Sequence, residues 1–344
     1  MRPVRTLIVD DSASMRATLK RMLSADPEIE VVGMAPEPFA ARDMIKTLNP
    51  DVLTLDVEMP GMDGLSFLER IMRLRPMPVV MCSTLTARGA EVTIEALRLG
   101  AVDYVTKPSG TPEDIERDAA LLCEKVKTAA RSVARAGPTR LPEQPSIAGG
   151  ATGKLIAIGS STGGVEALFS LLPALPADCP PVLIVQHMPA SFTSSFAKRL
   201  DAECRVRVVE ATEGATVQPG TVYIAPGGDT HMELSGGIAG RIKLRAGDLV
   251  TGHRPSVDVL FRSVAPLGAA AVGAILTGMG QDGAEGLLAM RRAGARTLGQ
   301  SKETCVVWGM PRAAKELGAV EKEVGLSALP EAILKACREK VGSV

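Results

Sequence analysis

The second half of the chain contains the segment Leu155-Ile-Ala-Ile-Gly-Ser-Ser-Thr-Gly-Gly164. Its apolar run predicts a buried strand, and its glycines predict a tight turn before a helix that begins near Gly164. This order places Ser161 at the carboxyl end of a strand, where the N–H groups and the dipole of the helix favour negative charge. The turn therefore suits either a nucleophilic serine beside an oxyanion site or a cradle for a phosphate group.

The composition predicts a globular protein of two domains. A chain of 344 residues can form two hydrophobic cores, and 46% apolar with 23% charged residues is ordinary for globular proteins. The 39 basic and 39 acidic residues cancel, which argues against nucleic acid or an anionic membrane as a partner. Aromatic residues make up 3%, too few for the stacking platforms that bind single-stranded nucleic acid.

The cysteines and the N-terminal segment indicate the compartment. None of the six cysteines forms a Cys-x-x-Cys pair, so we expect reduced thiols rather than a zinc site. The N-terminal segment lacks the apolar region of a signal peptide, and no apolar run approaches the roughly 20 residues of a membrane span. We therefore expect a cytoplasmic protein that does not insert into a membrane.

Residues 6–108 alternate short apolar runs with amphipathic segments. The apolar runs predict strands near 6–9, 30–34, 52–55, 78–82 and 102–105. Helices are predicted near 14–24, 38–48, 65–74, 88–99 and 112–135. This alternation predicts a five-stranded parallel sheet covered by helices on both faces.

Glycine and proline interrupt the pattern at residues 136–153, which predicts a linker. We place a first domain at 1–125, a helix end and linker at 126–153, and a second domain at 154–344.

A second alternating pattern begins at Lys154. Strands are predicted at 155–158, 182–186, 206–209, 222–225, 270–276 and 296–299, and helices near 164–172, 193–203, 256–265, 283–293 and 326–340. Two further runs, 231–234 and 241–244, flank Ser235-Gly-Gly237 and predict a hairpin. The pattern predicts a doubly wound α/β domain with a small antiparallel hairpin.

Acidic residues follow two strands of the first domain. Asp10 and Asp11 come directly after the first strand and Asp56 after the third, so parallel pairing brings them to one edge of the sheet. Carboxylates this close repel one another unless a hard cation such as Mg²⁺ lies among them. Ser83 and Lys107 follow the fourth and fifth strands, where a phosphoryl group on Asp56 would need a hydroxyl and an ammonium. Taken singly, each aspartate also fits a helix cap or a turn, and the lysine fits a solvated charge.

This pattern resembles the receiver domain of two-component response regulators over about residues 3–125. The matching motifs are Asp10-Asp11, Leu55-Asp-Val-Glu-Met-Pro-Gly-Met-Asp-Gly64, Val80-Met-Cys-Ser83 and Thr106-Lys-Pro108.

The receiver resemblance implies a flavodoxin-like fold that is phosphorylated on Asp56 by a histidine kinase. It implies Mg²⁺ held by Asp11, Asp56 and the Glu58 carbonyl, with Asp10 supporting the metal. It further implies that the phosphoryl oxygens are bound by Ser83, or by the adjacent Thr84, and by Lys107.

Three residues of the second domain suit nucleophilic catalysis. His187 follows the strand predicted at 182–186 and could reach the Ser161 hydroxyl as a general base. Asp282, in the glycine turn after the strand at 270–276, is the candidate that orients the imidazole. Backbone N–H groups near Thr162 and Met279 would form the oxyanion hole. The order Ser, His, Asp differs from the Ser, Asp, His of α/β-hydrolases, so the Gly-x-Ser-x-Gly turn predicts the same roles on a different fold.

Each of these residues has a simpler interpretation. Ser161 and Asp282 could cap helices, and His187 could be a buried histidine with its hydrogen bonds satisfied. Residues 159–164 also approximate the Gly-x-Gly-x-x-Gly of dinucleotide-binding proteins, but the next strand ends in Gln186-His187 where those proteins need Asp or Glu. The sequence therefore favours nucleophilic catalysis. His253 could line a substrate groove or belong to an ordinary loop, and His231 is less well placed.

The second half resembles the chemotaxis protein-glutamate methylesterases over about residues 154–340. The motifs are Gly159-Ser-Ser-Thr-Gly-Gly164, Gln186-His-Met-Pro189, Ala225-Pro-Gly-Gly-Asp-Thr-His-Met232, His253-Arg-Pro-Ser-Val-Asp-Val-Leu-Phe261 and Leu276-Thr-Gly-Met-Gly-Gln-Asp-Gly283. The resemblance implies hydrolysis of glutamyl γ-methyl esters on the cytoplasmic helices of chemoreceptors, with release of methanol and without a cofactor. It also implies deamidation of receptor glutamines. Ser160 departs from the family, whose members often have alanine there.

A receiver in the same chain as an esterase suggests that it controls access to the esterase. We expect the unphosphorylated receiver to cover the Ser161 groove and phosphorylation of Asp56 to weaken that contact. The alternative is a response regulator that acts without catalysis, through DNA or protein. The second half has no helix-turn-helix signal and no basic stripe, which disfavours DNA.

Overall fold

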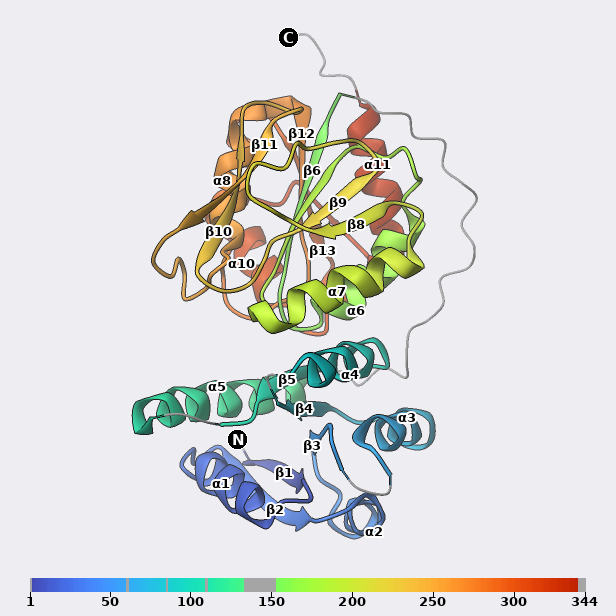
Figure 1. The fold of residues 1–344 in the computed structure, drawn as a ribbon, viewed down its shortest axis with the longest axis vertical. Coiled ribbons are helices and arrows are strands. Elements are labelled where there is room, and N and C mark those ends of the chain that lie inside the picture. Colours follow the sequence, from blue (N-terminus) through green and yellow to red (C-terminus); the bar gives the residue numbers. More distant parts are fainter. Residues whose placement is uncertain (1, 60–61, 85, 109–110, 133–152, 340–344) are drawn as a thin grey trace. The chain divides into compact units, whose positions relative to one another are not determined.

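The computed structural model describes residues 2–59, 62–84, 86–108, 111–132 and 153–339, and the chain separates into two compact units. The units are Met1–Thr139 and Arg140–Val344, each with a parallel sheet of its own (Figure 1).

The first unit alternates five strands with five helices. The strands are β1 (Val4–Val9), β2 (Ile29–Ala35), β3 (Val52–Asp56), β4 (Val79–Ser83) and β5 (Asp103–Thr106). The helices are α1 (Ala13–Ser24), α2 (Pro38–Leu48), α3 (Gly64–Leu74), α4 (Ala87–Arg98) and α5 (Pro112–Arg131). All strand pairs are parallel, and the order is β2-β1-β3-β4-β5. This is the predicted five-stranded α/β fold, and the ends of predicted and observed elements differ by at most four residues.

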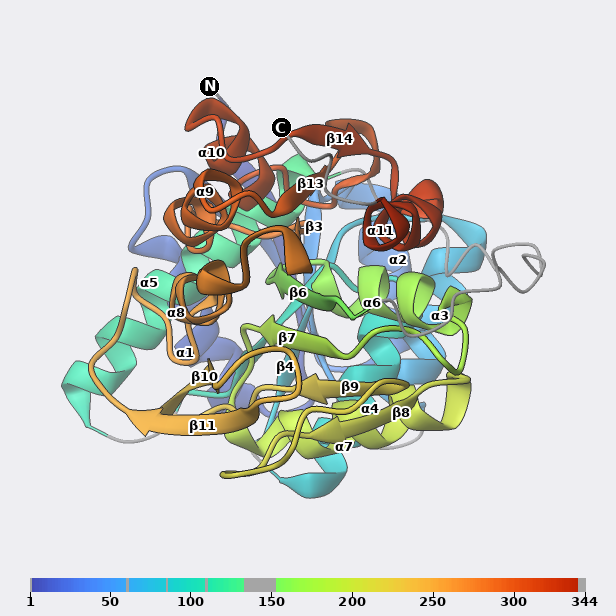
Figure 2. The ribbon, with the colours of Figure 1, turned by 90° about the horizontal axis from the view of Figure 1, so that it is seen from above.

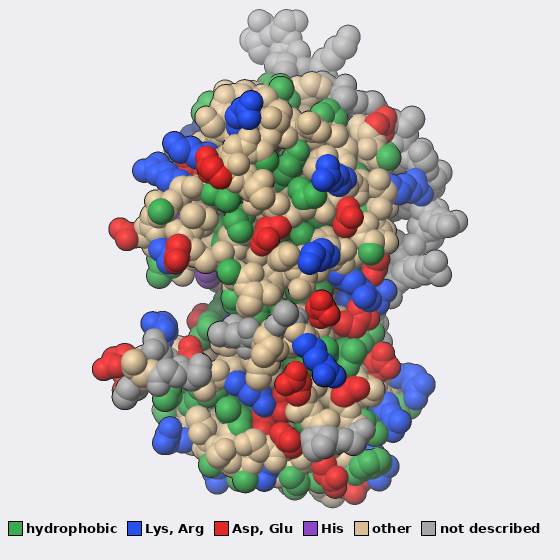
Figure 3. All heavy atoms as spheres, in the orientation of Figure 1, with side chains coloured by type: hydrophobic (Ala, Val, Ile, Leu, Met, Phe, Trp, Pro, Cys, Tyr) green, Lys and Arg blue, Asp and Glu red, His purple; other side chains and the backbone are tan. Residues whose placement is uncertain are grey.

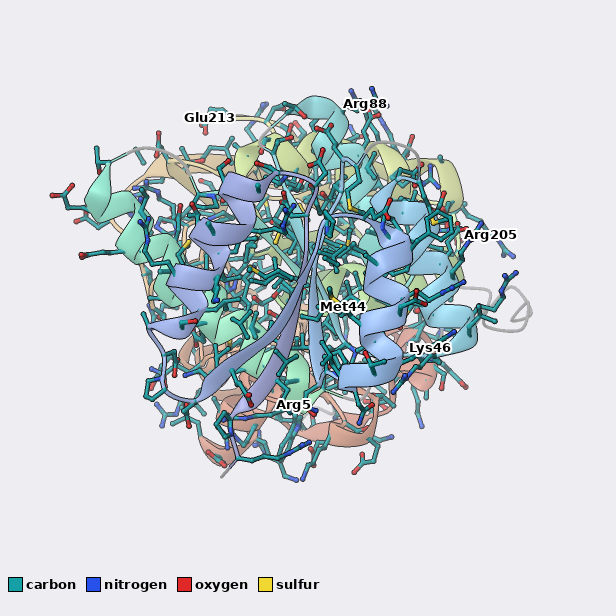
Figure 4. The ribbon with its side chains drawn as sticks, turned by 90° about the horizontal axis from the view of Figure 1, so that it is seen from below. Arg5, Met44, Lys46, Arg88, Arg205 and Glu213 are labelled. Carbon is teal, nitrogen blue, oxygen red and sulfur yellow. The ribbon has the colours of Figure 1, made fainter. Side chains whose placement is uncertain are left out.

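Helices cover both faces of this sheet, with α1 and α5 on one face and α2, α3 and α4 on the other (Figure 1). Every residue of the central strand β3 and of its neighbour β4 is buried, as expected for strands packed on both sides. The helices turn an apolar side to the sheet. On α2, Met44 points toward the strands and Lys46 points away from them (Figure 4).

The second unit contains a seven-stranded parallel sheet with the order β14-β13-β12-β6-β7-β9-β8. Its strands are β6 (Leu155–Ser160), β7 (Val182–Gln186), β8 (Arg207–Glu210), β9 (Thr221–Ile224), β12 (Ala271–Ile275), β13 (Arg296–Gln300) and β14 (Lys322–Val324). Strands β10 (Thr230–Ser235) and β11 (Arg241–Ala246) form a separate antiparallel hairpin, as predicted.

The helices of the second unit lie on both faces of its sheet, which confirms the predicted doubly wound fold. They are α6 (Gly164–Leu171), α7 (Ala190–Glu203), α8 (Val257–Val264), α9 (Ala284–Arg292), α10 (Met310–Glu316) and α11 (Leu329–Arg338). Helices α8, α9 and α10 cover one face, and α6, α7 and α11 cover the other (Figure 2). Short 3₁₀ turns follow α6 and α8, precede α11 and lie at Lys302–Thr304.

Some predictions for element ends and small elements were wrong. The sequence pattern gave neither β14 nor α10, because three and seven residues are too few for a periodicity to stand out. The predicted helix at 326–340 is a 3₁₀ turn, Leu326–Ala328, followed by α11. Helix α5 ends at Arg131, and the rest of its predicted range together with linker residues 136–152 lies outside the described residues.

Strand order creates a switch point in each sheet. In the second unit, the chain passes from β6 to β7 and to the strands beyond it on one side. The later strands begin at β12, which pairs with the other side of β6. In the first unit the corresponding point lies between β1 and β3. Loops at the carboxyl ends of such strands diverge and leave room for a ligand. The candidate residues after β1, β3, β6 and β12 therefore lie at the two places where this fold class binds ligands.

Two structural observations concern nucleic acid and membranes, the partners against which the composition argues. On the face shown in Figure 3, lysine and arginine side chains are interspersed with aspartate and glutamate side chains. Within the described ranges, the structure has no helix long and apolar enough to cross a membrane.

Candidate active site

Three carboxylates meet at the carboxyl edge of the first sheet. Asp10 and Asp11 follow β1, Asp56 ends β3, and one oxygen from each lies within 4.8 Å of the others. Asp10 and Asp56 are buried, while Asp11 is exposed. The Nζ atom of Lys107 lies 3.0 Å from Oδ2 of Asp10 and 2.8 Å from Oδ2 of Asp56. The predicted acidic residues and lysine therefore form one cluster.

Burial and ion pairing shift the pKa values of Asp56 and Lys107 in opposite directions. Burial raises the pKa of Asp56 above its ordinary value, although the Lys107 ammonium pulls it down. For Lys107, burial lowers the pKa, but the Asp56 and Asp10 carboxylates outweigh burial and raise it. An all-oxygen group of carboxylates with one exposed member is the donor set that suits Mg²⁺. The cluster fits the metal that the sequence predicts.

Two other predicted receiver residues lie beside the cluster. The Glu58 N–H donates to Oδ1 of Asp56 at 3.2 Å. Ser83 ends β4 and is fully buried, and its hydroxyl lies 3.2 Å from the Thr84 carbonyl and 3.3 Å from the Gly89 carbonyl. The Ser83 hydroxyl thus bonds to backbone carbonyls of the β4–α4 loop and of the first turn of α4. Its predicted contact with a phosphoryl group would require these bonds to be exchanged.

In the second unit, the turn after β6 presents Ser161 at the edge of the sheet. Helix α6 begins at Gly164, and its N-cap is Gly163, whose φ of 75° lies in the left-handed region that favours glycine. The helix has no side-chain cap, so the interpretation of Ser161 as a helix cap is wrong. The Ser161 N–H instead donates to the Thr277 carbonyl on the loop after β12 at 3.1 Å.

His187 and Asp282 form a direct pair. Nε2 of His187 lies 2.8 Å from Oδ2 of Asp282. His187 is set beside the Ser161 turn because its N–H donates to the Ser160 carbonyl at 3.1 Å. Its other ring nitrogen, Nδ1, is buried and has no hydrogen-bond partner in the described part of the chain. The structure thus leaves Nδ1 as the ring atom available to a reacting group.

Asp282 is buried among hydrogen-bond donors at the start of α8. Its Oδ1 accepts from the Ser256 hydroxyl at 2.7 Å and from the Asp258 N–H at 3.1 Å. Its Oδ2 accepts from the Val257 N–H at 2.7 Å as well as from His187. Burial alone raises the pKa of Asp282, but the bonds from His187, Ser256 and Val257 outweigh it and the pKa lies below its ordinary value of 3.8. The carboxylate is therefore held ionised at neutral pH.

His253 lies directly against His187. The two imidazole rings stack with centroids 3.7 Å apart and an angle of 9° between their planes. His253 thus lies beside the His187–Asp282 pair. The stacked ring covers one face of His187 and restricts its rotation.

The turn after β12 completes the edge of the site next to Ser161. A Cβ atom on Gly278 would lie 2.9 Å from Cβ of Ser161, so only glycine allows this approach. The loop before α10 fixes the turn, because the Gly278 N–H donates to the Val307 carbonyl at 3.0 Å and the Gly278 carbonyl accepts from the Met310 N–H at 2.8 Å. Met279, a predicted oxyanion residue, follows directly. Thr162, the other, is buried in the Ser161 turn.

Sequence reasoning missed the polar residues that support the site. The Gln186 amide donates to the carbonyls of Ser161 at 3.0 Å and of His187 at 3.2 Å, and so links the two loops. Its oxygen accepts from the Ser160 hydroxyl at 2.7 Å, a contact that explains how serine fits at this position. Ser256 lies within the motif His253–Phe261, but nothing in that motif predicts its contact with Asp282. None of these side chains has a recognisable spacing, because each acts between segments distant in sequence.

Comparison with known proteins places both units in families. The family model described as CheB methylesterase matches residues 156–333, and the one described as response regulator receiver domain matches residues 6–118. The chain is 57% identical over 347 residues to "Protein-glutamate methylesterase/protein-glutamine glutaminase 1" of Caulobacter vibrioides, with 97% of this chain and 98% of that protein covered. It is also 57% identical to the protein of the same name from Rhizobium johnstonii, with 97% and 96% covered.

The solved structures agree with this assignment. The crystal structure of the Thermotoga maritima CheB methylesterase catalytic domain matches with a TM-score of 0.51 and 39% identity, and it covers 53% of this chain and 97% of that domain. The chain therefore belongs to the CheB methylesterase family and carries an N-terminal response regulator receiver domain.

Proposed function

We propose that this methylesterase uses Ser161 to hydrolyse glutamate γ-methyl esters on chemoreceptors, with release of methanol, and that it also deamidates receptor glutamines. The observation that carries the proposal is the 2.8 Å pair of His187 and Asp282 beside the Ser161 turn. The relatives named above are methylesterases and glutaminases. The alternative, a response regulator that acts without catalysis, leaves the buried His187–Asp282 pair without a function and is not favoured.

The first step forms an acyl-enzyme. Because the Asp282 carboxylate can only accept, Nε2 of His187 carries a hydrogen and Nδ1 is the basic atom. Nδ1 takes the hydroxyl proton as Oγ of Ser161 attacks the ester carbonyl carbon. The tetrahedral intermediate collapses, the C–O bond to the methoxy group breaks, and His187 returns the proton so that methanol leaves.

The second step restores the enzyme. A water molecule attacks the acyl carbon while Nδ1 of His187 takes its proton, and the bond to Oγ breaks as Ser161 is reprotonated. The product is the glutamate side chain. With a glutamine substrate the first leaving group is ammonia, and the remaining steps are the same.

The oxyanion site is assigned to the backbone N–H groups of Thr162 and Met279. Thr162 lies in the turn that bears Ser161, and Met279 follows Gly278, which contacts Ser161. Donors from two rigid turns placed where charge develops are each worth roughly 3 kcal/mol of transition-state stabilisation.

The receiver supplies control. Asp56 is the phosphorylation site, and a histidine kinase is the phosphoryl donor. Asp11, Asp56 and the Glu58 carbonyl would hold Mg²⁺, with Asp10 in support. When bound, the ion neutralises charge on the transferring phosphoryl group. Lys107 pairs with the phosphoryl oxygens, and Ser83 binds them after leaving its backbone partners.

Phosphorylation acts by uncovering Ser161. In this proposal the unphosphorylated receiver covers the Ser161 groove, and charge added at Asp56 shifts the population toward an uncovered enzyme. A covered state favoured by a few kcal/mol is sufficient for such a switch.

Replacing Gly278 by alanine should lower the rate of methanol release by on the order of 10²-fold, the loss that follows a displacement of about 1 Å at a reacting centre. The new methyl group would lie 2.9 Å from Cβ of Ser161 and 2.2 Å from Sδ of Met310. The matched control is Gly325→Ala, whose methyl group meets no atom closer than 3.5 Å. Equal rates for the two variants would contradict the placement of Gly278 against the nucleophile.

Mg²⁺ should raise the melting temperature of the receiver in the full chain. A ligand that binds only the folded state contributes about 2.7 kcal/mol at a concentration 100 times its Kd. Calorimetry with and without MgCl₂ should show the shift in the wild type and lose it in Asp11→Asn. Asp43→Asn, an exposed aspartate on α2 that pairs with Arg42, serves as the control and should keep the shift. A full shift in Asp11→Asn would count against this metal site.

The direct test of the activity uses membranes that carry methylated chemoreceptors. Incubation with the full chain should release methanol, and mass spectrometry of receptor peptides should show glutamine converted to glutamate. Membranes that stay methylated in the presence of folded protein supplied with acetyl phosphate would overturn the proposal.

A further inference from the structure

The antiparallel hairpin and its histidine have no part in the mechanism above. We propose that His231 is a positioning residue of the hydrolytic site, and that it acts on His187 through Ser256 and Asp282. This inference rests on the proposed function, because it assigns a role relative to the Ser161, His187 and Asp282 site.

The hydrogen bonds of His231 permit only one state of its ring. Nε2 lies 2.8 Å from the Asp248 carbonyl, which can only accept, so Nε2 carries a hydrogen. Nδ1 lies 3.1 Å from the Ser256 backbone nitrogen, which can only donate, so Nδ1 is a bare acceptor. His231 is therefore a neutral imidazole with a fixed tautomer. It is buried, with 4% of its surface exposed.

The residue that His231 holds is the one that binds Asp282. Ser256 is the N-cap of α8, and its hydroxyl donates to Oδ1 of Asp282 at 2.7 Å. The next two backbone N–H groups also donate to Asp282. One bond at Ser256 N thus fixes the backbone from which three donors reach the carboxylate. The chain continues from Asp282 to Nε2 of His187.

His231 lies on β10 and links the hairpin to the start of helix α8. Hairpin strands β10 and β11 are already joined by their own ladder, from the Thr230–Ala246 pair to the Ser235–Arg241 pair. The His231 ring adds nothing to that ladder but reaches the start of α8. A second link joins β10 to the far end of α8, where the Leu234 N–H donates to the Ser263 hydroxyl at 2.9 Å. The hairpin therefore braces α8 at both ends, and only the His231 end touches the donors of Asp282.

These two links provide a matched pair of variants. His231→Leu removes the acceptor for the Ser256 N–H and should let the start of α8 and its donors shift. Ser263→Ala removes the other brace without touching Asp282. His231→Asn is the conservative variant, because its side-chain oxygen is separated from Cβ by the same two bonds as Nδ1 and can accept from Ser256.

The test measures kcat and KM for methanol release by the full chain, with the melting temperature of each variant. We expect kcat of His231→Leu to fall by on the order of 10- to 100-fold, the range seen when the outer partners that orient a metal-ligating histidine are removed. KM should change little, because His231 contacts residues of the protein rather than substrate. His231→Asn should recover most of kcat, and Ser263→Ala should keep it at a comparable loss of melting temperature.

Proton NMR of the same variants adds a measurement that should not change if His231 only stabilises the fold. The hydrogen between His187 and Asp282 should give a strongly deshielded signal in the wild type, in Ser263→Ala and in His231→Asn. It should be shifted or broadened in His231→Leu.

Two results would overturn the inference. One is a kcat for His231→Leu no lower than that of Ser263→Ala; the other is an equal loss in the Leu and Asn variants with an unchanged His187 signal. Ser161→Ala, run alongside, separates this failure from failure of the proposed function. If Ser161→Ala stays active, the assignment of the nucleophile is wrong whatever the His231 variants show.

Discussion

Replacing Ser161 by alanine should lower kcat for methanol release by on the order of 10⁶-fold, the loss seen when the nucleophile of a serine hydrolase is removed. The hydroxyl is the only protein group in the proposed mechanism that forms a bond to the substrate carbon. Backbone donors and substrate binding remain in the variant, so a residual rate above that of water is expected. The measurement is single-turnover methanol release at saturating enzyme.

The neighbouring serine is the control for this substitution. The hydroxyl of Ser160 is buried and donates to Gln186. Gln186 still binds the carbonyls of Ser161 and His187 when that bond is lost. Ser160→Ala should therefore stay within a few-fold of the wild type. A large loss in Ser160→Ala with a small loss in Ser161→Ala would reverse the assignment of the nucleophile.

Replacing Asp282 by asparagine should lower kcat by roughly 10⁴-fold, as for the aspartate of a serine protease triad. The carboxylate accepts four hydrogen bonds, and an amide offers one oxygen and an NH₂ group in its place. In either orientation the NH₂ group faces a backbone N–H donor of α8, from Asp258 or from Val257, and in the second orientation it also donates to His187 and moves the ring hydrogen to Nδ1. In both cases the negative charge that stabilises protonated His187 is lost.

The control for Asp282→Asn is Asp201→Asn on α7. Oδ1 of Asp201 accepts from the Val208 N–H at 2.7 Å, and an amide oxygen can keep that bond. This variant should retain wild-type turnover. A loss of less than about tenfold in Asp282→Asn, with the fold intact, would contradict the role given to Asp282.

The same substitution has an expected pH dependence of stability. Because the pKa of Asp282 in the folded protein lies below 3.8, ionisation of this group stabilises the fold above pH 3.8 and the contribution is lost as the pH falls. The difference in the free energy of unfolding between the wild type and Asp282→Asn should therefore shrink as the pH is lowered below 3.8. Denaturant titrations across that range measure it.

Site residues that directly follow a strand could be predicted from the sequence. Short elements and the contacts that support the site could not. Ser161, His187 and the receiver aspartates each follow an apolar run, and parallel pairing then brings strand ends to one edge. Strand β14 and helix α10 were missed because they are too short to show a period. Their positions are set by packing on β13 and α9, which local sequence does not encode.

The supporting contacts could not be predicted for a different reason. Which ring nitrogen of His187 faces Asp282 depends on how the loops after β7 and β12 approach each other. The contact of His231 with Ser256 depends on a hairpin that lies outside the main sheet. Such contacts join residues more than twenty positions apart through single atoms, and no periodicity or motif spacing records them.

The most direct test of the central claim is the rate of methanol release from methylated chemoreceptor membranes by the full chain, with and without acetyl phosphate. The account predicts that acetyl phosphate accelerates the wild type, that Asp56→Ala keeps the unstimulated rate under both conditions, and that Ser161→Ala stays at background under both. Release by Ser161→Ala at the wild-type rate, or equal stimulation of Asp56→Ala and the wild type, would contradict it.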